Sequence, residues 1–217
     1  MDFPHPPAAA LAALRQLTAA DSDLARVLQH AGPLPWRARS PGFPGLLQAI
    51  VAQQISNQAA AAIWGRLRAT PGALEPASLR TLPDEAFRAA GLSRPKIVHA
   101  RTLAAAFLDG TLDPARIAAL DDEAAIAAIA AVRGLGRWTA EVYLLFALGR
   151  TDVFPAGDVA LAASVAHLKG LDARPAPPAL RAMAEAWRPA RSLAARVLWH
   201  HWRFVTGRPA LDDFPVL

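Results

Sequence analysis

Residues 131–161, AVRGLGRWTAEVYLLFALGRTDVFPAGDVAL, contain the pattern that decides the fold. They are typical of two helices joined by a tight turn at residues 132–136, because two glycines flank the apolar Leu135. We expect Leu135 to pack between the helices, and Gly134 and Gly136 to expose backbone amides where the second helix starts. An exposed helix N-terminus favours anions, so this turn can hold a phosphate. The same pattern occurs in ordinary helical hairpins, and the turn alone leaves both interpretations open.

Asp158 follows Pro155-Ala156-Gly157 and precedes a helical run, which is typical of a helix N-terminus. An aspartate in that position commonly caps its helix by accepting backbone amides. It can also serve catalysis, because a helix N-terminus favours an ionised carboxylate and a fixed negative charge stabilises a developing cation. The two roles are compatible.

Proline and glycine punctuate the rest of the chain, and nearly every segment between them has a helical pattern. No run alternates as a strand does, so we predict an all-α fold of about ten helices. The predicted helices are residues 8–17, 21–30, 45–69, 84–90, 95–108, 121–131, 137–148, 158–168, 178–187 and 189–205. The third is expected to break near residues 54–57. Residues 33–44 are predicted to be a loop or extended, residues 71–83 to be rich in turns, and Asp113 to start a short turn.

The composition excludes several classes of protein. Of the 217 residues, 53% are apolar and many of these are alanine, which favours a core of close-packed helices. The formal net charge is +5, carried almost entirely by arginine, which fits either a phosphate-bearing partner or a GC-rich coding sequence. The absence of cysteine excludes disulfides, thiolate zinc sites and cysteine-ligated iron–sulfur clusters. We predict neither a signal peptide nor a membrane span, and expect a cytoplasmic monomer.

Several further motifs accompany the hairpin at ordered spacing. They are FPGLLQAIVAQQIS at residues 43–56, GLS at 91–93 with Lys96, GLGRWTA at 134–140, DVFP at 152–155 with Asp158, WRP at 187–189 with Arg191-Ser192, and Trp199. With these motifs the chain resembles the helix-hairpin-helix DNA glycosylase superfamily, and is similar to its bacterial DNA-3-methyladenine glycosylase II members. The resemblance covers about residues 40–205 of what we take to be a single domain, residues 1–217. It implies a two-lobed helical core with a DNA-binding cleft between the lobes, without the extra N-terminal α/β lobe of larger members.

The resemblance also implies an activity in base excision repair. Such an enzyme binds double-stranded DNA with alkylated bases such as 3-methyladenine, flips the base out and hydrolyses its N-glycosidic bond. Asp158 would stabilise the oxocarbenium-like sugar, and can orient or deprotonate the attacking water. Bifunctional members carry a lysine nucleophile where this chain has Trp138, so a monofunctional, nucleoid-associated hydrolase is expected. The alternative is a non-catalytic helix-hairpin-helix DNA-binding module, which would not need Asp158.

By the same resemblance, the flipped base would lie against aromatic side chains. Trp138 and Trp199 are the main candidates for this pocket, and Tyr143, Trp64 and Trp187 are weaker ones. Alkylated bases often carry positive charge, which an indole attracts through its π face. Core packing is the alternative for each of these aromatic residues.

The remaining expectations concern contacts with the DNA backbone. The residues expected to bind DNA are Gly134, Leu135, Gly136, Arg137, Thr139, Gln53, Gln54 and Ser56. Gln54, with Gln53 or Ile55 beside it, is the candidate wedge that fills the space left by the flipped base; surface amides on a helix are the alternative. No cofactor is expected beyond a structural Na⁺ or K⁺, which the backbone carbonyls of Ala130, Val132 and Leu135 would hold. The histidines are interpreted as structural or surface residues.

Overall fold

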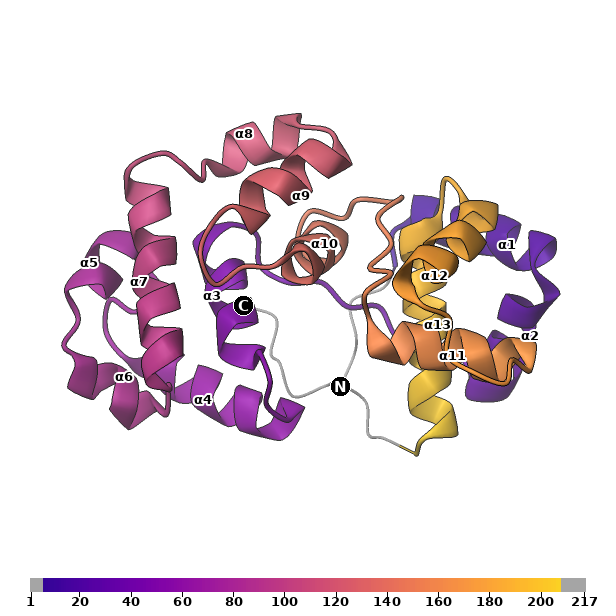
Figure 1. Cartoon of the computed structure of the whole chain (residues 1–217), viewed down its shortest axis with the longest axis horizontal. Helices are drawn as coiled ribbons and strands as arrows, with labels where there is room; N and C mark the ends of the chain where they lie inside the picture. The colour runs from indigo at the N-terminus through magenta and orange to yellow at the C-terminus, as the bar shows by residue number, and fades with distance from the viewer. Residues whose placement is uncertain (1–5, 208–217) are drawn as a thin grey trace. The chain divides into compact units, whose positions relative to one another are not determined.

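The computed structural model describes residues 6–207, and none of these residues lies in a strand. They form thirteen α-helices and one short 3-10 helix, which confirms the all-α prediction. The chain divides into two compact units (Figure 1). Residues 6–37 and 149–207 of the described chain form the first unit, and residues 38–148 form the second.

The first unit is built around α13 (Arg191–Val205). The other elements of this unit are α1 (Ala8–Ala20), α2 (Ser22–Ala31), α11 (Val159–Lys169), α12 (Pro177–Ala184) and the 3-10 helix η1 (Glu185–Trp187). Helix α13 contacts α1, α2 and α11, and its residues from Ser192 to Leu198 are buried without interruption. A helix that is buried on nearly every side belongs at the centre of a core.

The second unit has α3 (Gly42–Ala52) at its centre. The other helices are α4 (Asn57–Ala69), α5 (Pro76–Thr81), α6 (Asp84–Ala90), α7 (Arg94–Leu108), α8 (Pro114–Ala119), α9 (Asp122–Ala130) and α10 (Arg137–Phe146). Eight of the eleven residues of α3 are buried. Figure 1 shows α3 between α7 and α10, and it contacts both of them.

Besides shifts of a few residues at other helix ends, the structure corrects the sequence-based assignment at α3, α5 and α8. Helix α3 starts at Gly42 and not at residue 45, because Pro44 is tolerated in the first turn of a helix. Helix α5 lies in the segment predicted to be turn-rich; it starts with Pro76 and buries Leu79. Helix α8 follows Asp113, which was predicted to start only a turn and instead caps this short helix. The predicted break near residues 54–57 is confirmed, since α3 ends at Ala52 and α4 starts at Asn57.

Candidate functional site

The predicted hairpin is present in the second unit, between α9 and α10. Leu135 is buried, as expected, and its amide donates to the carbonyl of Val132 across the turn at 3.0 Å. Gly136 is the N-cap of α10, and no side chain caps this helix. The first amides of a helix have no partner within the helix, so the start of α10 is suited to bind an anion.

Gly134 contacts two side chains from outside the hairpin. Its φ is +98°, a conformation that side chains rarely adopt, and a Cβ built on it would lie 2.4 Å from Cγ of His99. His99 belongs to α7, and this short distance means that its side chain packs against the hairpin. In addition, Nε2 of Gln53 donates to the Gly134 carbonyl at 2.9 Å. Gln53 therefore supports the hairpin from the end of α3.

Arg137 and Thr139, both predicted to bind DNA, have contacts within the protein. Arg137 forms ion pairs with Glu123 at 2.6 Å and with the buried Glu141 at 2.8 Å. Its bond to Glu123 raises the pKa of Arg137 above the ordinary value. Thr139 is only 4% exposed, so its side chain is buried within the protein and its predicted contact with DNA stays a prediction.

The predicted aromatic residues differ in exposure. Trp138 lies in the first turn of α10 and is 42% exposed, and Trp199 is half-buried on α13 in the first unit. Tyr143 is buried, and its hydroxyl accepts the amide of Gly42 at 2.7 Å. Burial raises the pKa of Tyr143. In the structure Tyr143 thus makes a hydrogen bond at the start of α3, while its binding of a base stays a prediction.

The two weaker tryptophan candidates lie in the cores of their units. Trp64 is fully buried on α4. Trp187 is buried against Phe154, with ring centroids 5.6 Å apart, and its indole N–H donates to Asp21 at 2.8 Å. Both positions match the core-packing alternative.

Asp158 is the N-cap of α11 in the first unit. Its Oδ1 accepts the amides of Ala160 at 2.8 Å and Leu161 at 3.0 Å, which confirms the predicted position at a helix N-terminus. Its own amide donates to the carbonyl of Pro155 at 2.9 Å. The carboxylate is therefore fixed in direction at the start of a helix and only half-buried.

The segment before Asp158 is pinned to the start of α13. The Ser192 hydroxyl donates to the carbonyl of Val153 at 2.9 Å and accepts the Val153 amide at 3.0 Å. Arg191 donates to Asp152 with Nε at 2.9 Å and Nη2 at 3.0 Å. The motifs contain all four residues, but nothing in their spacing indicated that they pair. These contacts position the loop that carries Asp158.

The candidate wedge lies at the corner between α3 and α4. Gln54 has a φ of +57° and is the single non-glycine residue with positive φ among residues 6–207. Its side chain is exposed, and the neighbouring Ile55 is 37% exposed. Ser56 caps α4 by accepting the Ala59 amide at 3.2 Å. The tight corner presents Gln54 and Ile55 to solvent, as a wedge requires.

The hairpin carbonyls are chemically suited to a monovalent cation. Val132 uses its carbonyl for the bond across the turn, but a carbonyl oxygen has a second lone pair. Ala130 ends α9, where carbonyls lack partners within the helix. The residues present therefore fit the expected ion.

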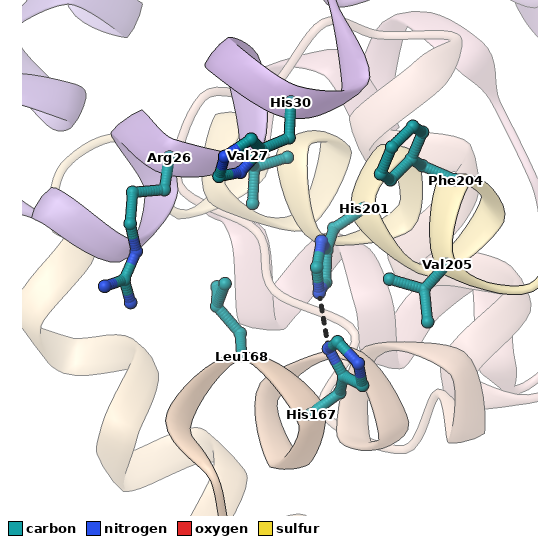
Figure 2. A pocket seen from close by; sticks show the side chains of 8 residues that line it. All are labelled: Arg26, Val27, His30, His167, Leu168, His201, Phe204 and Val205. Carbon is teal, nitrogen blue, oxygen red and sulfur yellow. Dashed lines mark hydrogen bonds between the residues drawn. The ribbon is translucent and has the colours of Figure 1, made fainter.

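Three histidines of the first unit line a cavity of about 270 Å³ between α2, α11 and α13 (Figure 2). His167 Nδ1 and His201 Nε2 are 3.1 Å apart and share a hydrogen bond, and His30 lines the same cavity. Burial, and next the charge of His167, lower the pKa of His201. Within residues 6–207, no group of three or more His, Cys, Asp or Glu side chains could hold a metal ion. The paired histidines thus link helices, in line with the structural interpretation.

The described part of the chain has no helix that is long and apolar enough to cross a membrane.

The glycine turn between α9 and α10, with no side-chain cap at the start of α10, defines a helix-hairpin-helix protein. The family model of the HhH-GPD superfamily of base excision DNA repair proteins matches residues 47–189, and the chain belongs to this superfamily. DNA-3-methyladenine glycosylase 1 of Schizosaccharomyces pombe is 31% identical over 161 residues, which are 72% of this chain and 71% of the relative.

Two solved structures show the same fold. The 3-methyladenine DNA glycosylase of Schizosaccharomyces pombe in complex with abasic DNA has a TM-score of 0.79 and 28% identity, over 94% of this chain and 98% of that chain. A DNA-3-methyladenine glycosidase from Bacillus halodurans has a TM-score of 0.78 and 31% identity, over 93% of this chain and 94% of that chain.

Proposed function

We propose that this protein is a monofunctional DNA glycosylase that removes alkylated bases, such as 3-methyladenine, from double-stranded DNA. The observation that carries this proposal is Asp158, a carboxylate fixed by two backbone amides at the start of α11, a short distance in sequence after the glycine hairpin. A non-catalytic DNA-binding module would not need this carboxylate. The names of the similar proteins support the same substrate class.

Asp158 would act on the sugar of the damaged nucleotide. As the N-glycosidic bond breaks, its electrons leave with the base and positive charge develops on the sugar. A carboxylate whose direction is already fixed stabilises that charge without reorganisation. Water then bonds to the anomeric carbon and loses a proton, for which Asp158 is the candidate base.

Trp138 supports hydrolysis without strand cleavage. An indole cannot form the Schiff base that a lysine nucleophile forms with the sugar. Its ring, in the first turn of α10, is 42% exposed and would stack on a flipped, positively charged base.

The hairpin would bind a DNA phosphate through the backbone amides at the start of α10, aided by a K⁺ or Na⁺ ion on the carbonyls of Ala130, Val132 and Leu135. A cation on these carbonyls predicts a higher melting temperature in KCl than in tetramethylammonium chloride at equal ionic strength. Equal melting temperatures in the two salts would remove the ion from the proposal.

The decisive experiment separates the charge of Asp158 from its capping role. Asparagine caps helices as well as aspartate does, so Asp158→Asn should keep the stability of α11 while losing the charge. We expect it to bind DNA but to release free base from methylated DNA about 10²–10³-fold more slowly than wild type, with no strand nicking by either protein. Asp158→Ala should lose both the activity and about 1 kcal/mol of stability.

Asp113→Asn is the matched control. Asp113 caps α8 by accepting the amides of Ala115 and Arg116, the same pattern that Asp158 uses. This variant should release base at the wild-type rate. If Asp158→Asn also does so, Asp158 is only a cap; if wild type binds DNA but releases no base, the binding module is the better interpretation.

A further inference from the structure

Lys96 follows the GLS motif of residues 91–93 and occupies an unusual position in α7. It lies in the first turn of this helix, where the partial positive charge of a helix N-terminus disfavours a cation. That turn contains no acidic residue to offset the charge. Lys96 therefore does not stabilise the start of its own helix, and its contribution has to come from a contact outside α7.

That contact is with the end of α3. Nζ of Lys96 donates to the carbonyl of Val51 at 2.7 Å, one residue before α3 ends at Ala52. A carbonyl in the last turn of a helix has no partner within the helix, and the helix dipole favours a cation there. Helix α3 has no basic residue in its own last turn. Burial lowers the pKa of Lys96, so its ammonium group is partly withdrawn from water to make this bond. Lys96 thus caps α3 from a neighbouring helix.

The capped end of α3 leads directly into the corner that carries the candidate wedge. Gln54 has a φ of +57°, and a residue with a side chain keeps such a conformation only where the surrounding structure enforces it. Before the corner, Lys96 holds the end of α3, and the side chain of Gln53 donates to the Gly134 carbonyl at 2.9 Å. After the corner, Ser56 caps α4. The backbone is therefore held on both sides of Gln54, while the side chain of Gln54 is exposed.

We propose that Lys96 is a positioning residue for base flipping: it fixes the end of α3, so that Gln54 enters the space that the flipped base leaves in the duplex. This rests on the proposed excision of a flipped base, with Gln54 as the wedge. Flipping costs unpairing and unstacking, and a wedge that is already in position offsets part of that cost. Lys96 would therefore affect the flipping of a paired base and not the chemistry that follows.

The test compares a paired with an unpaired damaged base. Duplexes carry a single 7-methylguanine opposite either cytosine or a stable abasic-site analogue, and base release is measured in single turnovers at saturating protein. An unpaired base costs less to flip, so its release depends less on the wedge. Lys96→Met removes the ammonium group and keeps a long side chain. We expect this variant to release the paired base about 10–10²-fold more slowly than wild type, and the unpaired base within about 3-fold of the wild-type rate.

A double-mutant cycle determines whether Lys96 acts through Gln54. Gln54→Ala should show the same preference for the unpaired base. Adding Lys96→Met to Gln54→Ala should slow release of the paired base little further, because the effects of residues that act through one another do not add.

Arg66→Met is the matched control. Nε of Arg66 donates to the carbonyl of Ala90, the last residue of α6, at 2.9 Å. This variant removes a similar contact at the end of another helix of the second unit, and should keep the wild-type rates on both duplexes. Circular dichroism verifies that each variant is folded, and Lys96→Gln provides the same test if the methionine variant does not fold.

Three results would overturn the proposal: Lys96→Met releases the paired base at the wild-type rate, it slows release from both duplexes equally, as a merely structural role predicts, or its effect is undiminished when Gln54→Ala is present. All three leave the glycosylase proposal intact, because wild type still releases the base. If wild type releases 7-methylguanine from neither duplex, the proposed excision itself is refuted, and the role of Lys96 with it.

Discussion

Replacing Gly134 with alanine should destabilise the protein strongly, because two costs coincide at this position. Its φ of +98° is a conformation that costs an alanine about 1–2 kcal/mol. The new methyl group would also lie 2.4 Å from Cγ of His99, and relieving such overpacking typically costs about 1–3 kcal/mol. Loss of freedom in the unfolded chain returns about 0.4–1 kcal/mol. We expect a net loss of about 3 kcal/mol, which lowers the melting temperature of a chain of this size by about 9 °C.

Gly136→Ala is the matched control for the Gly134→Ala substitution. Gly136 has a φ of −97°, and no atom lies within 4 Å of the position that a Cβ would take there. The weaker N-cap and the reduced freedom of the unfolded chain roughly offset each other at this residue, so its melting temperature should stay within about 3 °C of wild type. Calorimetry of both variants tests the argument, and equal melting temperatures would refute it. Adding His99→Ala should relieve only part of the cost, because the His99 Cβ contact of 2.6 Å remains.

Three other contacts lead to predictions of stability. Arg191→Lys loses the bidentate contact with Asp152, and calorimetry should show a free energy of unfolding lower by about 1–2 kcal/mol. An unchanged melting temperature would mean that this ion pair does not hold the loop before Asp158. Tyr143→Phe leaves the Gly42 amide without its acceptor and should cost about 1 kcal/mol in a thermal melt, with an unchanged single-turnover rate of base release; a slower rate would show that Tyr143 touches the substrate. The lowered pKa of His201 means that the unfolded chain binds more protons in mild acid, so stability should fall as the pH drops below about 6.5, and His201→Gln should show a smaller fall in melting temperature from pH 7 to pH 5.

Much of the fold could be predicted because its signals are local. Proline and glycine mark most helix ends, and Gly91 and Gly170 indeed end α6 and α11 in the left-handed conformation. The short helices α5 and α8 were missed because six residues, fewer than two helical turns, are too short to show a periodic pattern. Their evidence is tertiary, since Leu79 and Ile117 are buried against other parts of the second unit.

In the candidate site too, local features could be predicted from the sequence and tertiary contacts could not. The position of Asp158 could be predicted because a cap depends on the residues next to it in sequence. The contacts of Gln53 and His99 with Gly134 could not, since they join residues 81 and 35 positions apart and depend on how α3, α7 and the hairpin pack. A glycine motif predicts where backbone is exposed, but not which side chain lies beside it.

For DNA binding, the position of each cationic side chain matters more than the net charge of the chain. Arg137 stands beside the hairpin and resembles a phosphate ligand in the sequence, yet its guanidinium is engaged by Glu123 and Glu141. An arginine held by two carboxylates would have to give up those contacts to bind DNA, whereas the start of α10 has no side-chain cap to displace. Binding of a phosphate by the hairpin would therefore depend first on backbone amides, and then on cationic side chains that have no carboxylate nearby. Arg133 meets that condition, because the turn that carries it, α3, α5 and α7 contain no carboxylate. A formal charge of +5 becomes evidence for DNA binding only once the cations already neutralised within the protein have been set aside.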